Sequence, residues 1–459
     1  MKINTSFVHY ALAIACLKGI SLLMLPIVTR FLPPDSYGVL NFLVSVAAML
    51  SIILGFGMAE MMFQFTAKIA ASALDSFIAQ CVKFTMCVSC LFLLIAIAAA
   101  DIWLALLPLK VEASHFILLM INLAVSSVLA IYLTRYRILQ QSKPYMLVAL
   151  CQGVLQACFT YILLSFNFGI FGVLLSGCLV TTMVTISLVL VHRRLLFCKE
   201  PFLSRKHFRY GSHIALSALF LYGLGGAENW FIASALGPSQ LAFYFIATQF
   251  SLALSLAFEP FRLWWFPVRF KRFESNPELA AKGAVMGCFI ITLLALFMMI
   301  FAPFMMTWLL PSHYHGSADY IAILCLILVI KTYAELLNLG CYLDKYTGYV
   351  PLINGVCAVI ALVSIARTTT FYGINGVFFG LLLAHTLRFL AFYLISQRIA
   401  RLRYQFTTLA VVFSLLVLHL VLAESIWLNI GLLTLSVLFA IKFLHTHSLD
   451  KVRDRYEYS

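Results

Sequence analysis

Apolar stretches long enough to cross a lipid bilayer recur along the whole chain. Of the 459 residues, 63% are hydrophobic and only 10% are charged, whereas an ordinary soluble protein carries about 25% charged residues. A backbone in lipid must satisfy its own hydrogen bonds, so only helices and closed barrels cross the hydrocarbon. The apolar stretches lack the alternating pattern of barrel strands. The sequence therefore predicts an all-α polytopic membrane protein.

We expect fourteen transmembrane helices, because each stretch of about 17–25 apolar residues matches roughly 30 Å of hydrocarbon. The first stretch is too long for a signal-peptide core and lacks a small-residue cleavage site, so we count it as a true span. The predicted spans are 7–30, 37–59, 77–100, 114–134, 145–166, 169–191, 210–236, 240–260, 284–302, 318–340, 350–366, 372–396, 406–423 and 426–443.

The second part of the chain repeats the first at an offset of roughly 204 residues. Such a duplication is typical of transporters, in which two homologous bundles enclose a central cavity. It predicts a six-helix lobe at 1–191, a cytoplasmic linker at 192–209, a second six-helix lobe at 210–396, and two added helices with a tail at 397–459. The matching pairs include His9 with His213, Pro34 with Pro238, Tyr145 with Tyr349, and the run Gly169–Val173 with Gly373–Val377.

The basic residues predict the orientation of the spans. With the N-terminus in the cytoplasm, about 24 of the 31 lysines and arginines fall in cytoplasmic segments, as the positive-inside rule requires. Only Arg30, Lys110 and Arg367 fall outside, and both termini are then cytoplasmic. The net charge of +14 follows from this topology. Nucleic-acid binding is not expected, because the charges flank spans and form no groove-reading motif.

A local motif adds a family resemblance. The segment Leu25–Gly38 (LPIVTRFLPPDSYG) closes the first span and opens the second, and Leu54–Glu60 (LGFGMAE) follows with an aromatic exit at Phe63 and Phe65. This pattern resembles the N-terminal signature of the Wzx-type polysaccharide transporters of the multidrug/oligosaccharidyl-lipid/polysaccharide exporter (MOP) superfamily. The prolines and Gly38 suit a tight outer turn, and the glycines at 55 and 57 suit close helix approach.

The resemblance implies a flippase for an undecaprenyl-pyrophosphate-linked oligosaccharide, used to make O-antigen or exopolysaccharide. The glycan headgroup would pass from the cytoplasmic to the periplasmic leaflet of a bacterial inner membrane, by alternating access through a cationic cavity between the lobes. Membrane lipid and the polysaccharide polymerase and chain-length proteins are the expected partners. No cofactor is expected, although transport could be coupled to H⁺ or Na⁺.

Three other functions stay open at this point. A multidrug exporter of the same superfamily shares the duplicated bundle, and a lipid II flippase is a second transport alternative. A membrane-embedded glycan polymerase or ligase belongs to a different class, but the outer loops near 101–113 and 303–318 are short for a catalytic domain. The sequence has no nucleophile triad, P-loop or Gly-rich phosphate cradle. We therefore expect a transporter and not an enzyme.

Cationic residues inside the predicted spans are the candidates for binding the anionic headgroup. A charge at the centre of a span costs about 2.5–3.5 kcal/mol on insertion scales, so it should face a cavity or a partner. Lys18 and Arg388 are such residues; Lys18 could instead pair with an acid on another span, and Arg388 could reach the cytoplasmic surface. Lys331 is spaced i,i+4 from Glu335, which predicts an ion pair, either structural or opened by pyrophosphate.

Acidic residues in the spans are the candidates for ion coupling or gating. Glu259 and Arg262 are spaced i,i+3 around Pro260 at the end of the eighth span, which suits an interfacial pair or, for Arg262, substrate binding. Glu228 lies deep in the seventh span after a glycine-rich stretch, where burial would favour its protonated form. Pairing of Glu228 with Lys18 is the alternative. We therefore assign Glu228, Glu335 and Glu259 to ion coupling or gating.

No metal site is expected. The twelve cysteines lie mostly inside spans, where they serve as small packing residues. Cys87 and Cys90 form a CxxC within an apolar helix, which does not suit a redox or metal role. His313 and His315, and the pair His445 and His447, lack further ligands nearby in the sequence.

Overall fold

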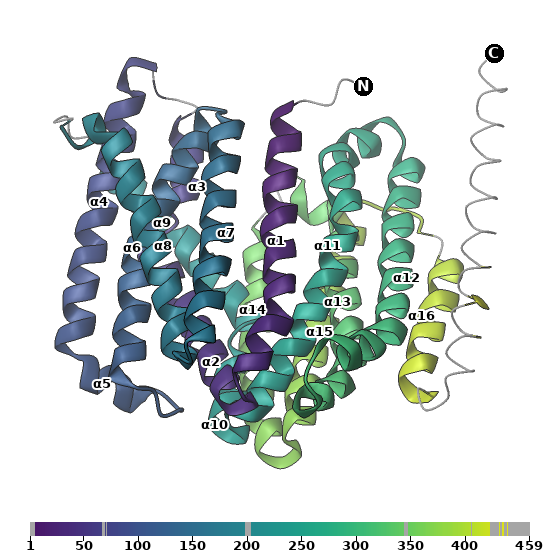
Figure 1. The fold of residues 1–459 in the computed structure, drawn as a ribbon. Helices are drawn as coiled ribbons and strands as arrows, with labels where there is room; N and C mark the ends of the chain where they lie inside the picture. Colours follow the sequence, from purple (N-terminus) through teal and green to yellow (C-terminus); the bar gives the residue numbers. More distant parts are fainter. Residues whose placement is uncertain are drawn as a thin grey trace. The chain divides into compact units, whose positions relative to one another are not determined.

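The structure, a computed structural model, describes residues 5–66, 69, 71–197, 203–343, 348–404, 406–422, 431, 434–435 and 438. All regular elements in these residues are helical (Figure 1), which confirms the all-α class. The α-helices are α1 (Thr5–Phe31), α2 (Pro34–Gly55), α3 (Met58–Thr66), α4 (Ala71–Ala98), α5 (Ala100–Leu106), α6 (Ala113–Ile138), α7 (Ser142–Ser165), α8 (Gly169–Val191), α9 (Arg205–Leu224), α10 (Glu228–Leu236), α11 (Pro238–Ser275), α12 (Pro277–Leu309), α13 (Ile321–Leu336), α14 (Tyr349–Tyr372), α15 (Ile374–Ile399) and α16 (Phe406–Leu422). Three 3₁₀ turns are η1 (Arg193–Phe197), η2 (Ser312–Tyr320) and η3 (Leu339–Tyr342).

Eleven helical segments of the described residues are long and apolar enough to cross a membrane, which makes this a multi-pass membrane protein. The seventh predicted span is not among them, because it is divided into α9 and α10. The thirteenth coincides with α16, and the fourteenth, 426–443, lies almost entirely outside the described residues. The count of fourteen spans and the cytoplasmic placement of both termini therefore stay predictions.

The helix α11 extends well past its predicted end near Pro260. Both Pro260 and Pro267 lie inside it, although each proline removes a backbone hydrogen bond from the helix. Packing explains why the helix continues: Trp265 is fully buried, and a Cβ at Gly283 of α12 would overlap its ring. At 38 residues, α11 is about 57 Å long and exceeds the thickness of the hydrocarbon.

The described chain forms two compact units. The first contains residues Met1–Phe245, Leu310–Tyr314 and Asn354–Gly380, and the second contains Ile246–Leu309, His315–Ile353 and Leu381–Ser459. This division follows spatial contact, whereas the two predicted six-helix lobes follow the sequence repeat. The lobes stay a prediction.

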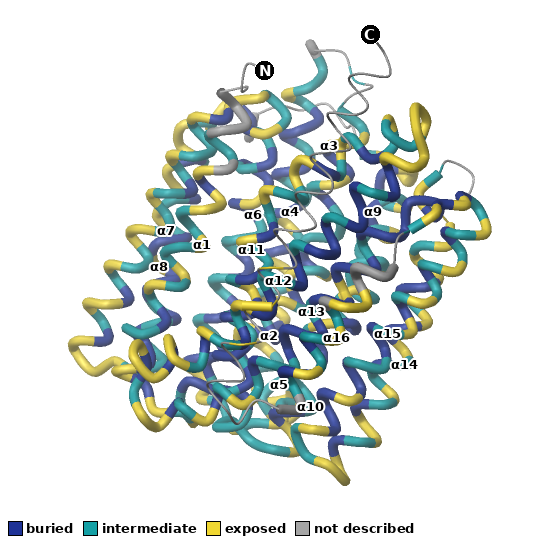
Figure 2. The backbone as a smooth tube through the Cα atoms, turned by 90° about the vertical axis from the view of Figure 1, so that its right-hand side faces the viewer, coloured by how far each residue is buried: buried dark blue, intermediate teal, exposed yellow. Residues whose placement is uncertain are grey.

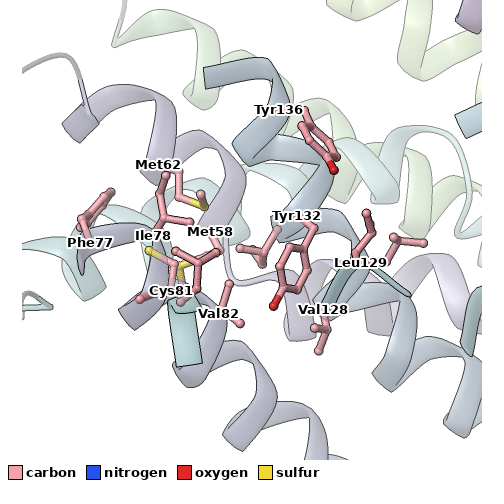
Figure 3. Packing of buried hydrophobic residues seen from close by; sticks show 14 of the residues in the cluster. Met58, Met62, Phe77, Ile78, Cys81, Val82, Val128, Leu129, Tyr132 and Tyr136 are labelled. Atoms are coloured by element: carbon pink, nitrogen blue, oxygen red, sulfur yellow. The ribbon is translucent and has the colours of Figure 1, made fainter. Parts of the chain in front are cut away.

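The first unit has an apolar core where α3, α4 and α6 meet. Met62, Phe77 and Ile78 are fully buried there, and Tyr132 of α6 is 1% exposed (Figure 3). On α7, by contrast, only a small share of the residues is buried (Figure 2). Apolar side chains such as Leu147 are exposed there. Exposed apolar faces of this kind are suited to contact with lipid.

Local structure repeats together with the sequence. Gly169 and Gly373, which are equivalent in the repeat, have φ angles of +55° and +57°. Gly169 is the first residue of α8, and Gly373 immediately precedes α15. Proline likewise begins both α2 and α11, at Pro34 and Pro238, where its missing N–H costs no helical hydrogen bond. The same local sequence thus produces the same turn twice.

The beginnings of α2 and α11 touch each other within the first unit. The Ser239 hydroxyl donates a hydrogen bond to the carboxylate of Asp35, which lies 204 positions earlier. A Cβ at Gly38 would overlap the carbonyl of Pro238, so only glycine permits this approach. Two residues that are equivalent in the sequence repeat therefore meet here. We call this group of contacts the α2–α11 latch.

Candidate functional site

A hollow of about 380 Å³ lies beside the break between α2 and α3, and we call it the helix-break hollow. The break is made by Phe56 and Gly57, which have φ angles of 44° and 62°. At Gly57 a Cβ would lie 2.7 Å from the side chain of Ile214 and 2.9 Å from the carbonyl oxygen of Gly211, so the break packs tightly against α9. Close approach at position 57 is therefore confirmed, but Gly55 has no atom within 4 Å of an added Cβ.

Four hydroxyl groups and one carboxylate lie in the otherwise apolar lining of the helix-break hollow. Ser51, Thr85, Ser126 and Ser127 contribute from α2, α4 and α6, and Glu60 contributes from α3. Both Ser126 and Ser127 donate to the carbonyl of Leu123 on their own helix, so their oxygens keep lone pairs for other donors. Glu60 is exposed and makes no ion pair with any other described residue. The hollow thus offers acceptors for a ligand rich in hydroxyl groups.

Glu228 is buried, with 7% of its surface exposed, at the first residue of α10. Its carboxylate accepts hydrogen bonds from the backbone N–H of Gly226 and from the Tyr244 hydroxyl, the latter at 2.9 Å. The glycine-rich stretch before it breaks the predicted seventh span and places the Gly226 N–H against the carboxylate, whereas Tyr244 reaches it from α11. The alternative pairing with Lys18 is not found among the described residues, where Lys18 is exposed on α1.

A second set of hydrogen bonds involves Ser45, Tyr222, Asn229 and Trp230. We call these bonds, together with those of Glu228, the Glu228 network. The hydroxyls of Ser45 and Tyr222 lie 2.9 Å apart, and the Trp230 indole N–H donates to Tyr222 at 3.0 Å. Asn229 donates to Ser45 through its amide nitrogen, whereas its amide oxygen is buried without a hydrogen-bond partner in the part of the chain that the structure describes. The network therefore includes a buried carboxylate and, among the described residues, an amide oxygen without a hydrogen-bond partner.

In the second unit, Arg262 lies between two carboxylates. It is 3.3 Å from Glu259, which confirms the predicted i,i+3 pair, and 2.8 Å from Glu335. The predicted pair of Lys331 with Glu335 is wrong, because Glu335 is taken by Arg262 and Lys331 is exposed. The spacing of two charged residues on one helix shows that they can form an ion pair. It does not show whether a residue on another helix pairs with one of them instead.

Two residues that the sequence did not single out connect this group to Arg388. Arg269 is 3% exposed and donates to the backbone carbonyl of Glu335, and its guanidinium lies 5.2 Å from the ring of Tyr342. Arg388 acts electrostatically on the same tyrosine and lies over the ring of Phe392. We call Arg262, Arg269, Arg388, Glu259 and Glu335 the Arg262 cluster; three cations and two anions leave it a net charge of +1.

Arg388 is 7% exposed, which does not fit the alternative that it reaches the cytoplasmic surface. Four predicted site residues therefore gather in the Arg262 cluster, and Glu228 lies in a separate network in the first unit. Lys18 and Lys331 belong to neither group, and no ion pair joins either of them to another described residue. Their exposure on α1 and α13 leaves both lysines accessible to a ligand.

Sequence reasoning missed Glu60 and Arg269 for different reasons. Glu60 stands in an otherwise apolar run after the glycines at 55 and 57, so an isolated acid at membrane depth was a usable signal. Arg269 follows Pro260 and Pro267, which suggested that the span had already ended. Nothing local in the sequence indicates that this arginine is buried.

Comparison with known protein families identifies the chain. Residues 5–273, more than half of the protein, match the family model described as "Polysaccharide biosynthesis protein". The chain belongs to this family. The resemblance seen in the motif at 25–65 is thereby confirmed. A comparison with curated proteins gives no match.

Solved structures of MOP-superfamily transporters share the fold of this family member. The inward-facing conformation of a multidrug resistance MATE family transporter gives a TM-score of 0.66 at 15% identity, over 88% of this chain and 96% of the other. A MOP superfamily transporter from Pyrococcus furiosus gives 0.61 at 16% identity, over 86% and 96%. A MATE transporter from Vibrio cholerae gives 0.60 at 16% identity, over 87% and 98%. The polysaccharide biosynthesis protein therefore has a transporter fold.

Proposed function

We propose that this polysaccharide biosynthesis protein is a flippase. Its substrate is an undecaprenyl-pyrophosphate-linked oligosaccharide, which it moves from the cytoplasmic to the periplasmic leaflet of a bacterial inner membrane for O-antigen or exopolysaccharide synthesis. The observation that carries the proposal is the family match over residues 5–273 on a chain that has the MOP transporter fold. A family that serves polysaccharide synthesis through a transporter fold needs a substrate that is both a glycan and membrane-bound.

The Arg262 cluster supports binding of the pyrophosphate. Charged oxygens cannot enter hydrocarbon without compensation, and arginine matches their geometry with paired donors. In the cluster, Arg262 is already paired with Glu335, so a pyrophosphate would compete with that carboxylate for the guanidinium. Lys331, one helical turn before Glu335, would add exposed positive charge in the same unit. Lys18 on α1 is a separate cationic candidate in the first unit.

The helix-break hollow supports binding of the sugar. Irregular backbone at membrane depth is tolerated where it is buried in protein or lines a cavity, as the break at Phe56 and Gly57 does. Sugar hydroxyls are donors as well as acceptors, and the hollow offers the lone pairs of Ser126 and Ser127 and the carboxylate of Glu60.

Alternating access is the mechanism that we infer for this flippase. The α2–α11 latch joins repeat-equivalent residues, Asp35 and Ser239, at ends that the predicted topology places on the periplasmic side. Tyr314 adds to the latch, because its hydroxyl donates to the carbonyl of Leu32 at 2.7 Å. A latch of this kind would have to open before the headgroup could leave on that side.

Glu228 is the best candidate for coupling to H⁺ or Na⁺. Its buried carboxylate and the unsatisfied amide oxygen of Asn229 would both suit a proton or a small cation. The protein itself would supply no catalysis, and we expect it to work beside a polysaccharide polymerase and a chain-length protein.

Depletion of the protein tests the flippase proposal. We expect one glycan repeat unit linked to undecaprenyl pyrophosphate to accumulate in the lipid extract, as measured by mass spectrometry. Loss of surface polysaccharide should accompany it. Intact surface polysaccharide without accumulation would contradict the proposal and would favour export of small molecules.

Complementation of the depleted cells tests the cationic residues. We expect Arg388→Ala and Arg262→Ala to reduce surface polysaccharide strongly. Lys18→Ala and Lys331→Ala should each reduce it less, because each lysine adds only one exposed positive charge. Ser234→Ala, an exposed position on α10, is the control at matched expression. Normal transport by Lys18→Ala, Lys331→Ala and Arg388→Ala alike would reject a cationic binding site.

A further inference from the structure

A second hollow, of about 500 Å³, lies at one end of α4, α6 and α8, entirely within the first unit. Its polar lining consists of Asp75, Arg135, His192, Arg193 and Arg194, and we call it the basic hollow. None of these residues belongs to the helix-break hollow, the Glu228 network or the Arg262 cluster. All five lie in segments that the predicted topology places on the cytoplasmic side, at or just beyond the ends of the spans.

The lining of the basic hollow contains more basic than acidic residues. Its three arginines and one aspartate have a formal net charge of +2 when the histidine is neutral. The closest nitrogen of Arg135 is 3.7 Å from Asp75, beyond the length of a good hydrogen bond, and the side chain of Asp75 is 65% exposed. This carboxylate can therefore move away from the arginine at little cost.

Arg135 is the deepest of the three cations. Its side chain is 14% exposed, and its Nε is buried without a hydrogen-bond partner among the described residues. A buried donor on a charged group is costly to leave without a hydrogen-bond partner. Arg135 thus contributes a largely buried guanidinium group to the lining of a hollow that has space for an acceptor.

Aromatic residues hold one wall of the basic hollow in place. The Tyr136 hydroxyl lies 2.9 Å from Nε2 of His192, and the ring of Tyr132 stacks on the imidazole at an interplanar angle of 16°. Both tyrosines are part of the apolar core shown in Figure 3. Burial lowers the pKa of His192 and Arg135 lowers it further, while Asp75 raises it. At neutral pH the histidine is thus a neutral, fixed wall residue beside the arginines.

We propose that the basic hollow binds the phosphate of an anionic membrane-lipid headgroup. Arginines bind phosphate oxygens with paired, charge-assisted hydrogen bonds, and Arg135, Arg193 and Arg194 all line this one space. The volume falls in the range of about 300–1,000 Å³ that is typical of ligand pockets. A basic pocket between helices at the cytoplasmic ends of spans lies at the depth of lipid phosphates. The phosphate would replace Asp75 as the partner of Arg135.

Native mass spectrometry of the full-length protein in detergent tests this site. With added phosphatidylglycerol we expect retained lipid on the wild-type protein, and about tenfold weaker retention for Arg135→Gln, the effect expected for loss of a charge-assisted hydrogen bond. Asp75→Asn should bind more tightly than the wild type, because it removes the competing carboxylate. Arg137→Gln is the matched control, since Arg137 is exposed on the same helix and lies over Phe63, outside the hollow. Phosphatidylcholine is the control lipid.

Three results would overturn the proposal. Retention that is equal for the wild type, Arg135→Gln and Asp75→Asn would show that the hollow holds no lipid phosphate. Equal retention of phosphatidylcholine and phosphatidylglycerol would exclude recognition of an anion. Complete displacement of the lipid by millimolar inorganic phosphate would assign the site to a free phosphate.

If Arg135→Gln does not fold, the double variant Arg193→Gln and Arg194→Gln on the 3₁₀ turn η1 gives the same readout. The measurement involves no transport, so it stands apart from the flippase proposal.

Discussion

Glu335 is held by a residue 73 positions away and not by the lysine one helical turn before it. The spacing of Lys331 and Glu335 satisfied the rule for a helical ion pair, yet α11 brings Arg262 within 2.8 Å of the carboxylate. The i,i+3 pair of Glu259 and Arg262, by contrast, forms as its spacing indicated. At the scale of the residue, charged positions could be predicted from the sequence, whereas their partners depend on how helices pack against one another.

A double-mutant cycle distinguishes the two pairs. We expect a coupling free energy of about 1 kcal/mol between Arg262→Ala and Glu335→Ala, the range found for residues in one ion-pair network. The same cycle on Lys331→Ala and Glu335→Ala should give a value near zero, because these side chains do not pair. Thermal unfolding in detergent provides the measurement. A larger coupling for the lysine pair would show that Glu335 is bound to Lys331 in the membrane.

Glu228→Gln should destabilise the protein. Two donors, the Tyr244 hydroxyl and the Gly226 N–H, face the two oxygens of the carboxylate, and glutamine would turn an N–H group towards one of them. A buried group left without its partner costs about 1–3 kcal/mol. We expect a lower Tm for Glu228→Gln and an unchanged Tm for Ser234→Ala on the same helix. An unchanged Tm for Glu228→Gln would show that the carboxylate is not held by these donors and is free for ion exchange.

The breaks at α2–α3 and α9–α10 are the elements that shape the candidate sites. Their glycines are visible in the sequence, and the loosening of the seventh span by its glycine-rich stretch was predictable. What the sequence could not show is that the first break packs against α9 and opens a hollow lined by Glu60. The sequence also could not show that α11 extends to Ser275. Burial of Trp265 stabilises the helix beyond Pro260 and Pro267, although both prolines disfavour it.

Two glycines of the N-terminal motif give a matched test at the scale of the element. Gly57→Ala should destabilise the protein by about 1–3 kcal/mol, because φ is +62° and the new Cβ would meet Ile214 and Gly211. Gly55→Ala should be neutral or slightly stabilising, since it faces open space at the end of a helix. The yield and Tm of folded protein provide the readout. Equal losses for both variants would mean that the break is not strained.

At the scale of the whole molecule, the duplication connects the sequence to the mechanism. The offset of roughly 204 residues can be recognised in the amino-acid sequence alone, and in the folded chain Asp35 and Ser239 touch across it. The division into two lobes still rests on the sequence. The α2–α11 latch joins equivalent residues of the two repeats, so it allows a test of whether the repeats move apart during transport.

A disulfide across the latch should stop transport. In Asp35→Cys with Ser239→Cys, oxidation would hold together two ends that must part if the periplasmic side opens. We expect loss of surface polysaccharide under oxidising conditions and recovery after reduction. The single variants are the controls. Full transport by the oxidised, cross-linked protein would reject the latch as a gate.

Reconstitution of the purified protein into liposomes tests the central claim most directly. Vesicles would carry an undecaprenyl-pyrophosphate-linked oligosaccharide in both leaflets, and a membrane-impermeant glycosidase would be added outside. The account predicts that only the outer glycan is cleaved in empty vesicles, whereas vesicles with the wild-type protein lose nearly all of it. Protection of the inner half in the presence of correctly folded protein would contradict a flippase.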